Sequence, residues 1–300
     1  MREVWDTLRL PDGRDLEVVL QGAEAGTLLI FHHGSPGAAT PFDAFDRAAA
    51  DRGIVLALPS RAGFGGSSRQ PERTVASAAA DAAALADHLG HERFLTAGWS
   101  GGGPHALACA ALLPERVLAA ATIAGVAPYD AEGLDWTAGM GEDNQVEYPT
   151  AARDPDELYS WMQPHVGAMA TIRAEDIVTE LRSLISGVDE AQLSGDFAEM
   201  LADNYRRAFR DGPWGWYDDD LAFVAPWGFD LGSINVPVSI WQGREDLMVP
   251  FAHGEWLLAH VPGARSRLRP EHGHLSLAVG GIGEIFDDLL EAGGLGASTA

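Results

Sequence analysis

The chain has 300 residues, of which 46% are hydrophobic and 21% charged, a composition typical of a folded globular protein and not of a disordered one. Its formal net charge of −24 argues against nucleic acid and anionic membranes as partners, because both would repel it. No apolar run approaches the roughly 18 residues that span a bilayer, and the acidic, amphipathic start does not resemble a secretory signal. We therefore expect a cytoplasmic protein.

Neither the cysteine content nor the acidic runs indicate a metal or another cofactor. A single cysteine, Cys109, forbids an internal disulfide and a cysteine-based zinc cluster, and its apolar helical surroundings predict a buried structural thiol. The run Asp218–Asp220 resembles a metal site only superficially, because three adjacent side chains point in different directions. We interpret this run as the solvated start of a helix.

Short strands alternate with helices at both ends of the chain. Alternating residues in Thr7–Leu10 and Leu16–Leu20 predict a β-hairpin at a sheet edge. Apolar runs typical of buried parallel strands follow at Thr27–Phe31, Ile54–Leu58, Phe94–Ala97, Leu118–Ile123 and Val238–Trp241, with a weaker strand around Leu268. Helical stretches between them are Phe42–Asp51, Val75–Leu89 and His105–Leu113. This order predicts a mostly parallel sheet covered on both faces, with function at the carboxyl ends of its strands.

The alternation stops across residues 128–233, where no strand is evident. Helical patterns lie there at Asp156–Met162, Ala174–Ser186 and Asp196–Arg210. A helical insertion between two strands sits above the strand ends, so we predict a cap on a core formed by residues 1–127 and 234–292. The small residues of 293–300 are expected to fray as a tail. The aromatic side chains of the cap either attach it to the core or line an apolar pocket. Pocket candidates from it are Trp136, Trp161, Trp214 and Trp216.

Ser100 lies in Gly98-Trp99-Ser100-Gly101-Gly102, between an apolar strand and a helix-like stretch. A sharp strand-to-helix turn presents a serine hydroxyl as a nucleophile, and glycines are needed around it because the turn is strained and crowded. The pattern alone is weak, but this context favours a nucleophile. Trp99, which precedes the serine, is a further pocket candidate.

A carboxylate and a histidine follow the last two predicted strands. Asp246, after Val238–Trp241, is preferred to Glu245 as the acid that orients an imidazole, because the third residue after the glycine faces inward in such a turn. His274 is preferred to His272 as the base, because Gly273 lets the loop turn tightly before the last helix. The order serine, aspartate, histidine at strand ends favours a catalytic triad.

The segment His33-Gly34-Ser35-Pro36-Gly37 follows the strand Thr27–Phe31 and predicts an oxyanion hole. Its glycines permit a backbone that turns N–H groups toward the nucleophile. The expected donors are the amides of Ser35 and Gly101, and the Ser35 hydroxyl is an additional candidate. His33 is a pocket candidate, although a role in bracing this loop by hydrogen bonds is the preferred interpretation.

Taken together, these motifs resemble the α/β-hydrolase superfamily. They are the His33, Ser100, Asp246 and His274 segments together with Arg61-Ala62-Gly63-Phe64-Gly65-Gly66-Ser67, and they stand in family order over most of the chain. The resemblance implies an eight-stranded, mostly parallel sheet with a helical cap inserted after strand six. Because dehalogenases and epoxide hydrolases of this fold carry aspartate at the elbow, Ser100 disfavours both.

The expected function is hydrolysis of a small carboxylic ester through an acyl-enzyme, as in a carboxylesterase, with Ser100, His274 and Asp246 as the triad. Alternatives with the same triad are cleavage of an amide, peptide or carbon–carbon bond, and cofactor-free perhydrolase chemistry. Trp99 before the nucleophile and Gly101 after it make a peptidase less favoured. A different class of function is binding of a small ligand without turnover. The expected partner is an ester-like small molecule, and the protein is expected to be a monomer or a homodimer.

Overall fold

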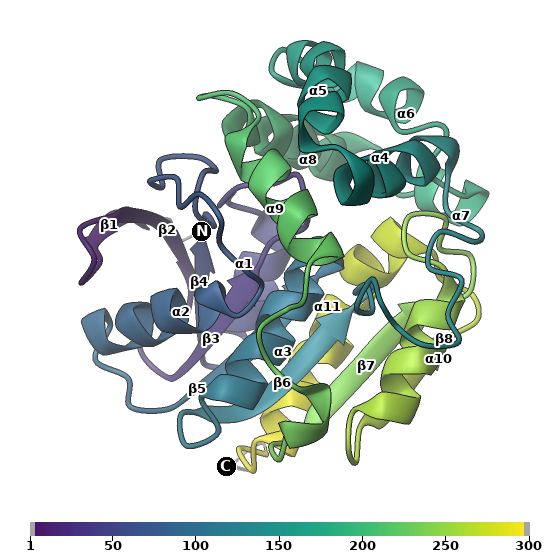
Figure 1. The fold of residues 1–300 in the computed structure, drawn as a ribbon. Coiled ribbons are helices and arrows are strands. Elements are labelled where there is room, and N and C mark those ends of the chain that lie inside the picture. Colours follow the sequence, from purple (N-terminus) through teal and green to yellow (C-terminus); the bar gives the residue numbers. More distant parts are fainter. Residues whose placement is uncertain (1–3, 297–300) are drawn as a thin grey trace.

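The computed structural model describes residues 4–296, which form one eight-stranded sheet flanked by helices (Figure 1). The strands lie in the order β1-β2-β4-β3-β5-β6-β7-β8. Their bounds are Val4–Arg9, Asp15–Gly22, Thr27–His32, Ile54–Pro59, Phe94–Trp99, Val117–Ile123, Val238–Gly243 and Arg265–Arg269 for β1 to β8. All pairs from β4 to β8 in this order are parallel, and β2 runs antiparallel to both of its neighbours. The predicted mostly parallel sheet is confirmed.

The predicted hairpin is also confirmed. β1 and β2 pair antiparallel with Leu8 opposite Leu16, and β1 is the edge of the sheet. Gly13 in the turn has a φ of +87°, a conformation that a glycine adopts without the steric cost of a side chain. β1 is largely exposed and β2 is largely buried, because β2 has a neighbour on each side.

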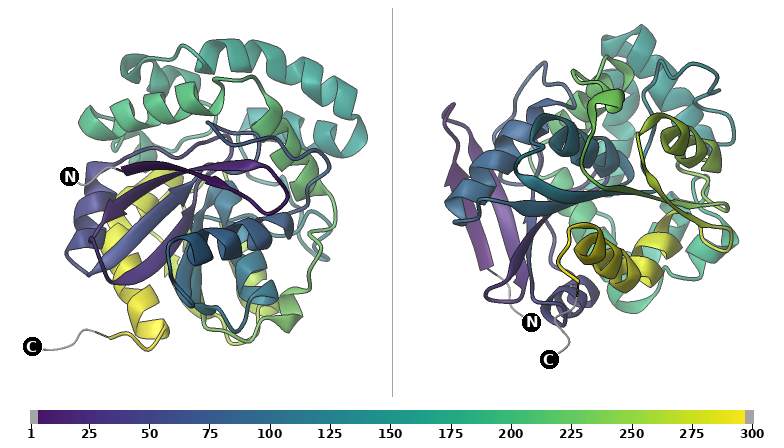
Figure 2. Two further views of the ribbon diagram at one scale, coloured as in Figure 1. Left: turned by 90° about the vertical axis from the view of Figure 1, so that its left-hand side faces the viewer. Right: turned by 90° about the horizontal axis from the view of Figure 1, so that it is seen from below.

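Helices cover both faces of the sheet (Figure 2). Three lie on one face and two on the other: α2 (Ser77–His88), α3 (Gly103–Leu112) and α10 (Phe251–His260), then α1 (Asp43–Ala50) and α11 (His274–Ala292). The middle of β3 illustrates why a buried strand is a continuous apolar run. Leu28 and Ile30 are buried on the face covered by α2, α3 and α10, whereas Leu29 and Phe31 are buried on the face covered by α1 and α11. Successive side chains of a strand point to opposite faces, so each residue enters a core.

Between β6 and β7 the chain forms a helical insertion, whose helices from residue 142 to 224 lie over one end of the sheet (Figure 1). Its helices are α4 (Glu142–Arg153), α5 (Pro155–Met169), α6 (Ile177–Glu180), α7 (Gly187–Glu190), α8 (Gly195–Ala208) and α9 (Trp214–Val224), with short 3-10 turns η2 (Ala174–Asp176) and η3 (Leu231–Ser233). The predicted segments Asp156–Met162 and Asp196–Arg210 match α5 and α8.

Two features of the insertion differ from the sequence prediction. The continuous helix expected over Ala174–Ser186 is wrong, because the chain leaves α6 after Glu180 and the Ser183 hydroxyl donates to Asp143 of α4 (2.6 Å). Ile177, Leu181 and Ile185 are still buried at helical spacing, so the apolar pattern was real although the helix is interrupted. The sequence also gave no signal for α4, which contains a proline, or for α9, which is buried along most of its length.

The last strand, β8, has a weak apolar pattern because it lies at the edge of the sheet and is rich in arginine. β8 carries three arginines, and each pairs with a carboxylate of the C-terminal segment: Arg265 and Arg267 with Asp288, and Arg269 with Glu284. Of the predicted tail, positions 293–296 follow the end of α11, and 297–300 lie outside the described residues. None of the helices in residues 4–296 is long and apolar enough to cross a membrane.

Candidate active site

Ser100 occupies the turn between β5 and α3. Its φ of +56° lies in the left-handed region, which costs a residue other than glycine roughly 1–2 kcal/mol. It is one of three such residues among those the structure describes. A strained turn at the end of a strand and a partly exposed side chain are the geometry that presents a serine hydroxyl to the solvent side of such a sheet.

The glycines on either side of Ser100 are required by close backbone contacts. A Cβ at Gly98 would lie 2.0 Å from the carbonyl oxygen of Gly102, and one at Gly102 would lie 2.1 Å from that of His32. Real Cβ atoms do not approach backbone so closely, so only glycine permits the start of α3 to pack against β3 and β5. The motif therefore reflects packing at the turn as well as its conformation.

His274 and Asp246 form a buried hydrogen-bonded pair. Nδ1 of His274 donates to Oδ2 of Asp246 at 2.8 Å, and both side chains are buried. Three further donors hold the carboxylate: the amides of Met248 and Val249 on Oδ1 (2.9 and 2.7 Å) and the side chain of Gln242 on Oδ2 (3.1 Å). This set fixes the carboxylate, which in turn fixes the tautomer of the imidazole and leaves Nε2 free to accept a proton.

Electrostatics raises the pKa of His274. Burial alone would lower it, but the Asp246 carboxylate, by charge and hydrogen bond, and the more distant Asp189 outweigh burial. Burial raises the pKa of Asp246, and the charge of His274 and its hydrogen bond act against this. The Asp246 carboxylate thus stabilises the imidazolium that forms when His274 accepts a proton.

Asp189, from α7 in the insertion, binds the start of the helix that carries His274. Its carboxylate accepts the backbone N–H groups of His274, Leu275 and Ser276 at 2.8 to 2.9 Å, and the side chain is fully buried. A carboxylate at a helix N-terminus satisfies amides that have no partner within the helix and complements the helix dipole. The insertion therefore positions the histidine directly.

Trp99 links the serine turn to the histidine. Its indole N–H donates to the backbone carbonyl of His274 (3.3 Å), and the two rings lie 5.6 Å apart between centroids. Because Trp99 directly precedes Ser100, this contact joins the serine turn to the start of α11. The three predicted triad residues, which are 146 and 28 positions apart along the chain, follow β5, β7 and β8, and these parallel strands end at the same edge of the sheet.

The loop after β3 lies against the serine turn. A Cβ at Gly34 would lie 3.3 Å from that of Ser100, and one at Gly101 would lie 2.8 Å from that of Ser35. Within the described part of the chain, the buried Ser35 hydroxyl has no hydrogen-bond partner. The two residues predicted to supply oxyanion donors, Ser35 and Gly101, are therefore neighbours in space.

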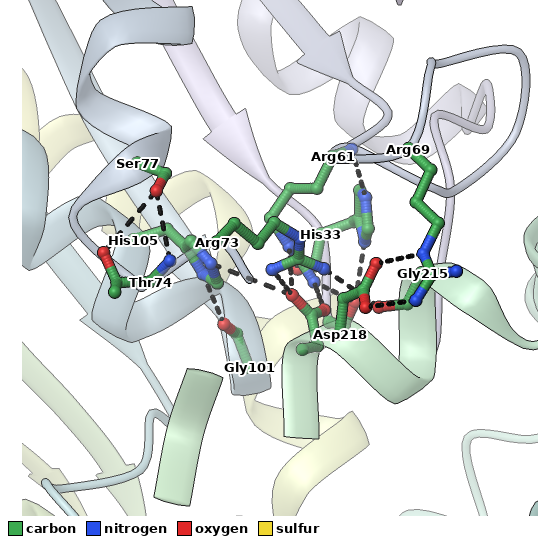
Figure 3. A network of polar contacts seen from close by, with 12 residues as sticks. His33, Arg61, Arg69, Arg73, Thr74, Ser77, Gly101, His105, Gly215 and Asp218 are labelled. Carbon is green, nitrogen blue, oxygen red and sulfur yellow. Dashed lines mark hydrogen bonds and ion pairs between the residues drawn. The ribbon is translucent and has the colours of Figure 1, made fainter. Parts of the chain in front are cut away.

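A buried ionic network holds this loop to the insertion (Figure 3). The His33 ring donates from Nδ1 to the Gly34 carbonyl (2.6 Å) and accepts the Arg61 amide at Nε2 (3.0 Å). The Arg61 guanidinium binds the carbonyls of His33 and Gly34 and pairs with Asp219 of α9 (2.7 Å), which also pairs with Arg73 (2.6 Å). Burial, and then the Arg61 charge, lower the pKa of His33 well below its ordinary value. His33 is thus a neutral brace of the loop.

Comparison with known proteins agrees with this geometry. Residues 27–280 match the family model of the alpha/beta hydrolase fold. The chain belongs to the α/β-hydrolase family. It is 26% identical over 269 residues to an uncharacterized hydrolase, YcgS, of Bacillus subtilis (strain 168), covering 88% of this chain and 89% of that one.

Solved structures show the same fold at low identity. A hydrolase from Pseudomonas aeruginosa superposes with a TM-score of 0.69 at 22% identity, over 98% of both chains. A thermophilic esterase from Thermogutta terrifontis superposes with a TM-score of 0.68 at 20% identity, over 98% of this chain and 99% of that one. The α/β-hydrolase fold predicted from the motifs is confirmed.

A cavity of about 110 Å³ lies between the core of this α/β hydrolase and the insertion. Ser100 and Ser35 are on its core side, and Trp161 and Trp216 are on its insertion side. These two tryptophans are predicted pocket residues that the structure places beside the serine. Further lining residues that the sequence did not single out are Asn144, Glu147, Tyr148, His165, Tyr205 and Phe209.

The other pocket candidates lie outside that lining. Trp136 packs against Tyr148 of α4 and donates a hydrogen bond to the Ala127 carbonyl (2.7 Å). These contacts hold the insertion against the core. Trp214 is covered by the Arg69 guanidinium, 3.9 Å from its ring centroid. His33 and Trp99 border a second, smaller cavity next to the serine turn.

The prediction for Asp218–Asp220 is wrong. These residues lie within α9 and are almost completely buried. Asp218 pairs with Arg69 (2.8 Å), and Asp219 pairs with the two arginines of the network. The solvated helix start failed as an interpretation because the compensating charges come from residues about 150 positions earlier in the chain.

Proposed function

We propose that this α/β hydrolase cleaves a small carboxylic ester through an acyl-enzyme formed on Ser100. The observation that carries the proposal is the buried hydrogen bond between His274 and Asp246 beside a serine held at a φ of +56°. A nucleophile, a base and an orienting carboxylate in this order are the parts that acyl transfer needs.

In the proposed mechanism, Nε2 of His274 accepts the proton of Ser100 as the hydroxyl oxygen attacks the ester carbonyl. The negative charge on the carbonyl oxygen is stabilised by the amides of Ser35 and Gly101 and by the Ser35 hydroxyl. A donor of this kind contributes roughly 3–4 kcal/mol to transition-state stabilisation. The imidazolium returns the proton to the departing alcohol. Water, deprotonated by His274, then attacks the acyl-enzyme, and the imidazolium returns that proton to the Ser100 oxygen as the carboxylic acid is released.

The ester proposal is tested by steady-state hydrolysis of p-nitrophenyl esters from acetate to octanoate. We expect turnover that rises and then falls with chain length, because the cavity beside Ser100 is small and enclosed by the insertion. A fluorophosphonate probe should label the same serine. Labelling without ester turnover would contradict the ester proposal and favour amide, carbon–carbon bond or perhydrolase chemistry. Neither labelling nor turnover would favour a ligand-binding protein.

The pH dependence of kcat/KM tests His274 as the base. Only the neutral imidazole accepts a proton, so activity is lost as pH falls through its pKa. On the acid side of the profile, the pH at which kcat/KM falls to half its maximum is the acid limb. Because the pKa of His274 is raised, this acid limb should lie above the ordinary histidine value of about 6.5. In Asp189→Asn, a negative charge that favours the imidazolium is removed, so the limb should move to lower pH.

The matched control for that variant is Asp196→Asn, which changes an exposed carboxylate of α8. We expect its acid limb to coincide with that of the native protein. An acid limb that is unchanged in Asp189→Asn would show that this carboxylate does not act on His274. A limb well below the ordinary histidine range in the native protein would contradict His274 as the base.

A further inference from the structure

The three consecutive aspartates of α9, Asp218 to Asp220, differ in whether a basic side chain neutralises them. Asp218 and Asp219 each pair with arginine, but Asp220 does not. Asp220 is fully buried, and neither of its carboxyl oxygens receives an N–H or hydroxyl donor from residues 4–296. Where α9 packs against α4, the carboxyl group of Glu147 lies close enough to act on Asp220 electrostatically. Buried acids without a basic partner are costly, so such a pair marks a candidate functional site.

Glu147 connects this acid pair to the active-site cavity. It lines the same cavity as Ser100, although only 5% of its surface is exposed. Its Oε1 accepts the Trp216 indole N–H at 2.6 Å, the one N–H donor that this carboxylate receives from residues 4–296. Burial, opposed by hydrogen bonds to Asp220 and Trp216, raises the pKa of Glu147, and burial next to Glu147 raises that of Asp220. Burial beside a second acid thus disfavours the charge on each carboxyl group, and a cation placed next to Glu147 relieves this cost.

The rest of the cavity lining is also acidic. Asp143 and Glu180 also line the cavity, which contains no arginine or lysine, and His165 is its one basic residue within residues 4–296. Aromatic rings form much of the wall. Those of Trp161 and Phe209 lie 5.7 and 5.6 Å from Trp216. Aromatic faces and carboxylates both stabilise a cation that has left water, and both disfavour an anion.

We propose that the cavity beside Ser100 binds the ammonium group of a cationic ester, with Glu147, supported by Asp220, as its ion-pairing partner. This inference rests on the proposed esterase function and specifies its substrate class. The ammonium N–H groups occupy the free acceptor positions of Glu147, and the aromatic wall encloses the aliphatic part of the substrate. Esters that carry a carboxylate are rejected by the same charges.

The test compares p-nitrophenyl esters that differ in one terminal group. They are ε-aminocaproate, its neutral isosteres heptanoate and ε-hydroxycaproate, and the anionic monoadipate, with β-alanine and butyrate esters as a shorter pair. We expect kcat/KM for the ammonium ester to exceed that of its isosteres by about tenfold, which corresponds to roughly 1.4 kcal/mol. The anionic ester should be the poorest substrate.

Glu147→Gln should bring the ratio of ammonium to neutral ester close to one, because it removes the charge at nearly constant volume. Glu199→Gln, on the exposed face of α8, should keep the native ratio. As a measurement that does not need a folded variant, hexylammonium should inhibit the native protein more strongly than hexanol. Stronger inhibition by hexanol would overturn the proposal.

Other outcomes separate this proposal from the function on which it rests. Neutral or hydroxylated esters cleaved as fast as the ammonium ester would overturn the ammonium site and leave the esterase intact. A native preference that persists in Glu147→Gln would overturn the role of Glu147. No cleavage of any of the esters would overturn the proposed function itself.

Discussion

Replacing Ser100 with alanine is expected to lower kcat for p-nitrophenyl butyrate by about 10⁶-fold, to the rate that binding and oxyanion donors alone provide. The expected loss is this large because the hydroxyl is the atom that forms the acyl bond. Steady-state kinetics on purified protein measures it, and active-site titration with a fluorophosphonate should show no labelled serine.

Ser266→Ala is the matched control, because it removes an exposed hydroxyl from the edge strand β8. It should retain native turnover. Thermal unfolding of Ser100→Ala establishes that the loss is chemical, since the substitution keeps the glycines that the turn requires. Substantial turnover by a folded Ser100→Ala protein would remove this serine from the mechanism.

Asp246→Asn is expected to lower kcat by about 10⁴-fold, as loss of the orienting carboxylate does in a triad. The carboxylate accepts bonds on both oxygens, from the amides of Met248 and Val249 on one and from Gln242 and His274 on the other. An asparagine that keeps the amide bonds turns its NH₂ toward His274. The imidazole then takes the tautomer that cannot accept the serine proton.

Kinetics of this variant should be measured beside Glu245→Gln, which changes the exposed carboxylate next to it. Glu245 was the alternative acid in the sequence motif, so the pair of variants separates the two assignments. Near-native kcat in Asp246→Asn, or a large loss in Glu245→Gln, would contradict the assignment made here. Burial of Asp246 predicts that its variant is also less stable than the control.

Local physical chemistry explains the part of the protein that could be predicted from its sequence. Apolar runs such as Thr27–Phe31 form strands because both faces of the sheet are covered, and each residue has a core to enter. The turn at Ser100 could be predicted from the glycines around it, because the turn depends on short-range backbone contacts that only glycine permits. The motifs containing Asp246 and His274 likewise stand at strand ends, where a parallel sheet brings distant segments together.

Pairings between distant residues were decided only by the tertiary structure. Asp189 has no motif, and its role depends on three amides 85 to 87 positions later in the chain. Asp219 is buried only because Arg61 and Arg73 neutralise it. The acid Glu147 lies in an unpredicted helix and meets Asp220 only when α4 packs against α9.

The sequence by itself therefore determined the sheet, the serine turn and the candidate triad, since each is encoded by neighbouring residues and by strand order. Only the tertiary structure decided which tryptophans of the insertion reach the cavity, where Trp161 and Trp216 lie beside Ser100 and Trp136 does not. It also decided which buried carboxylates pair with an arginine, as Asp219 does, and which do not, as with Asp220. The physical reason is that the charge balance and lining of a buried site are sums over residues that the chain brings together only when it folds.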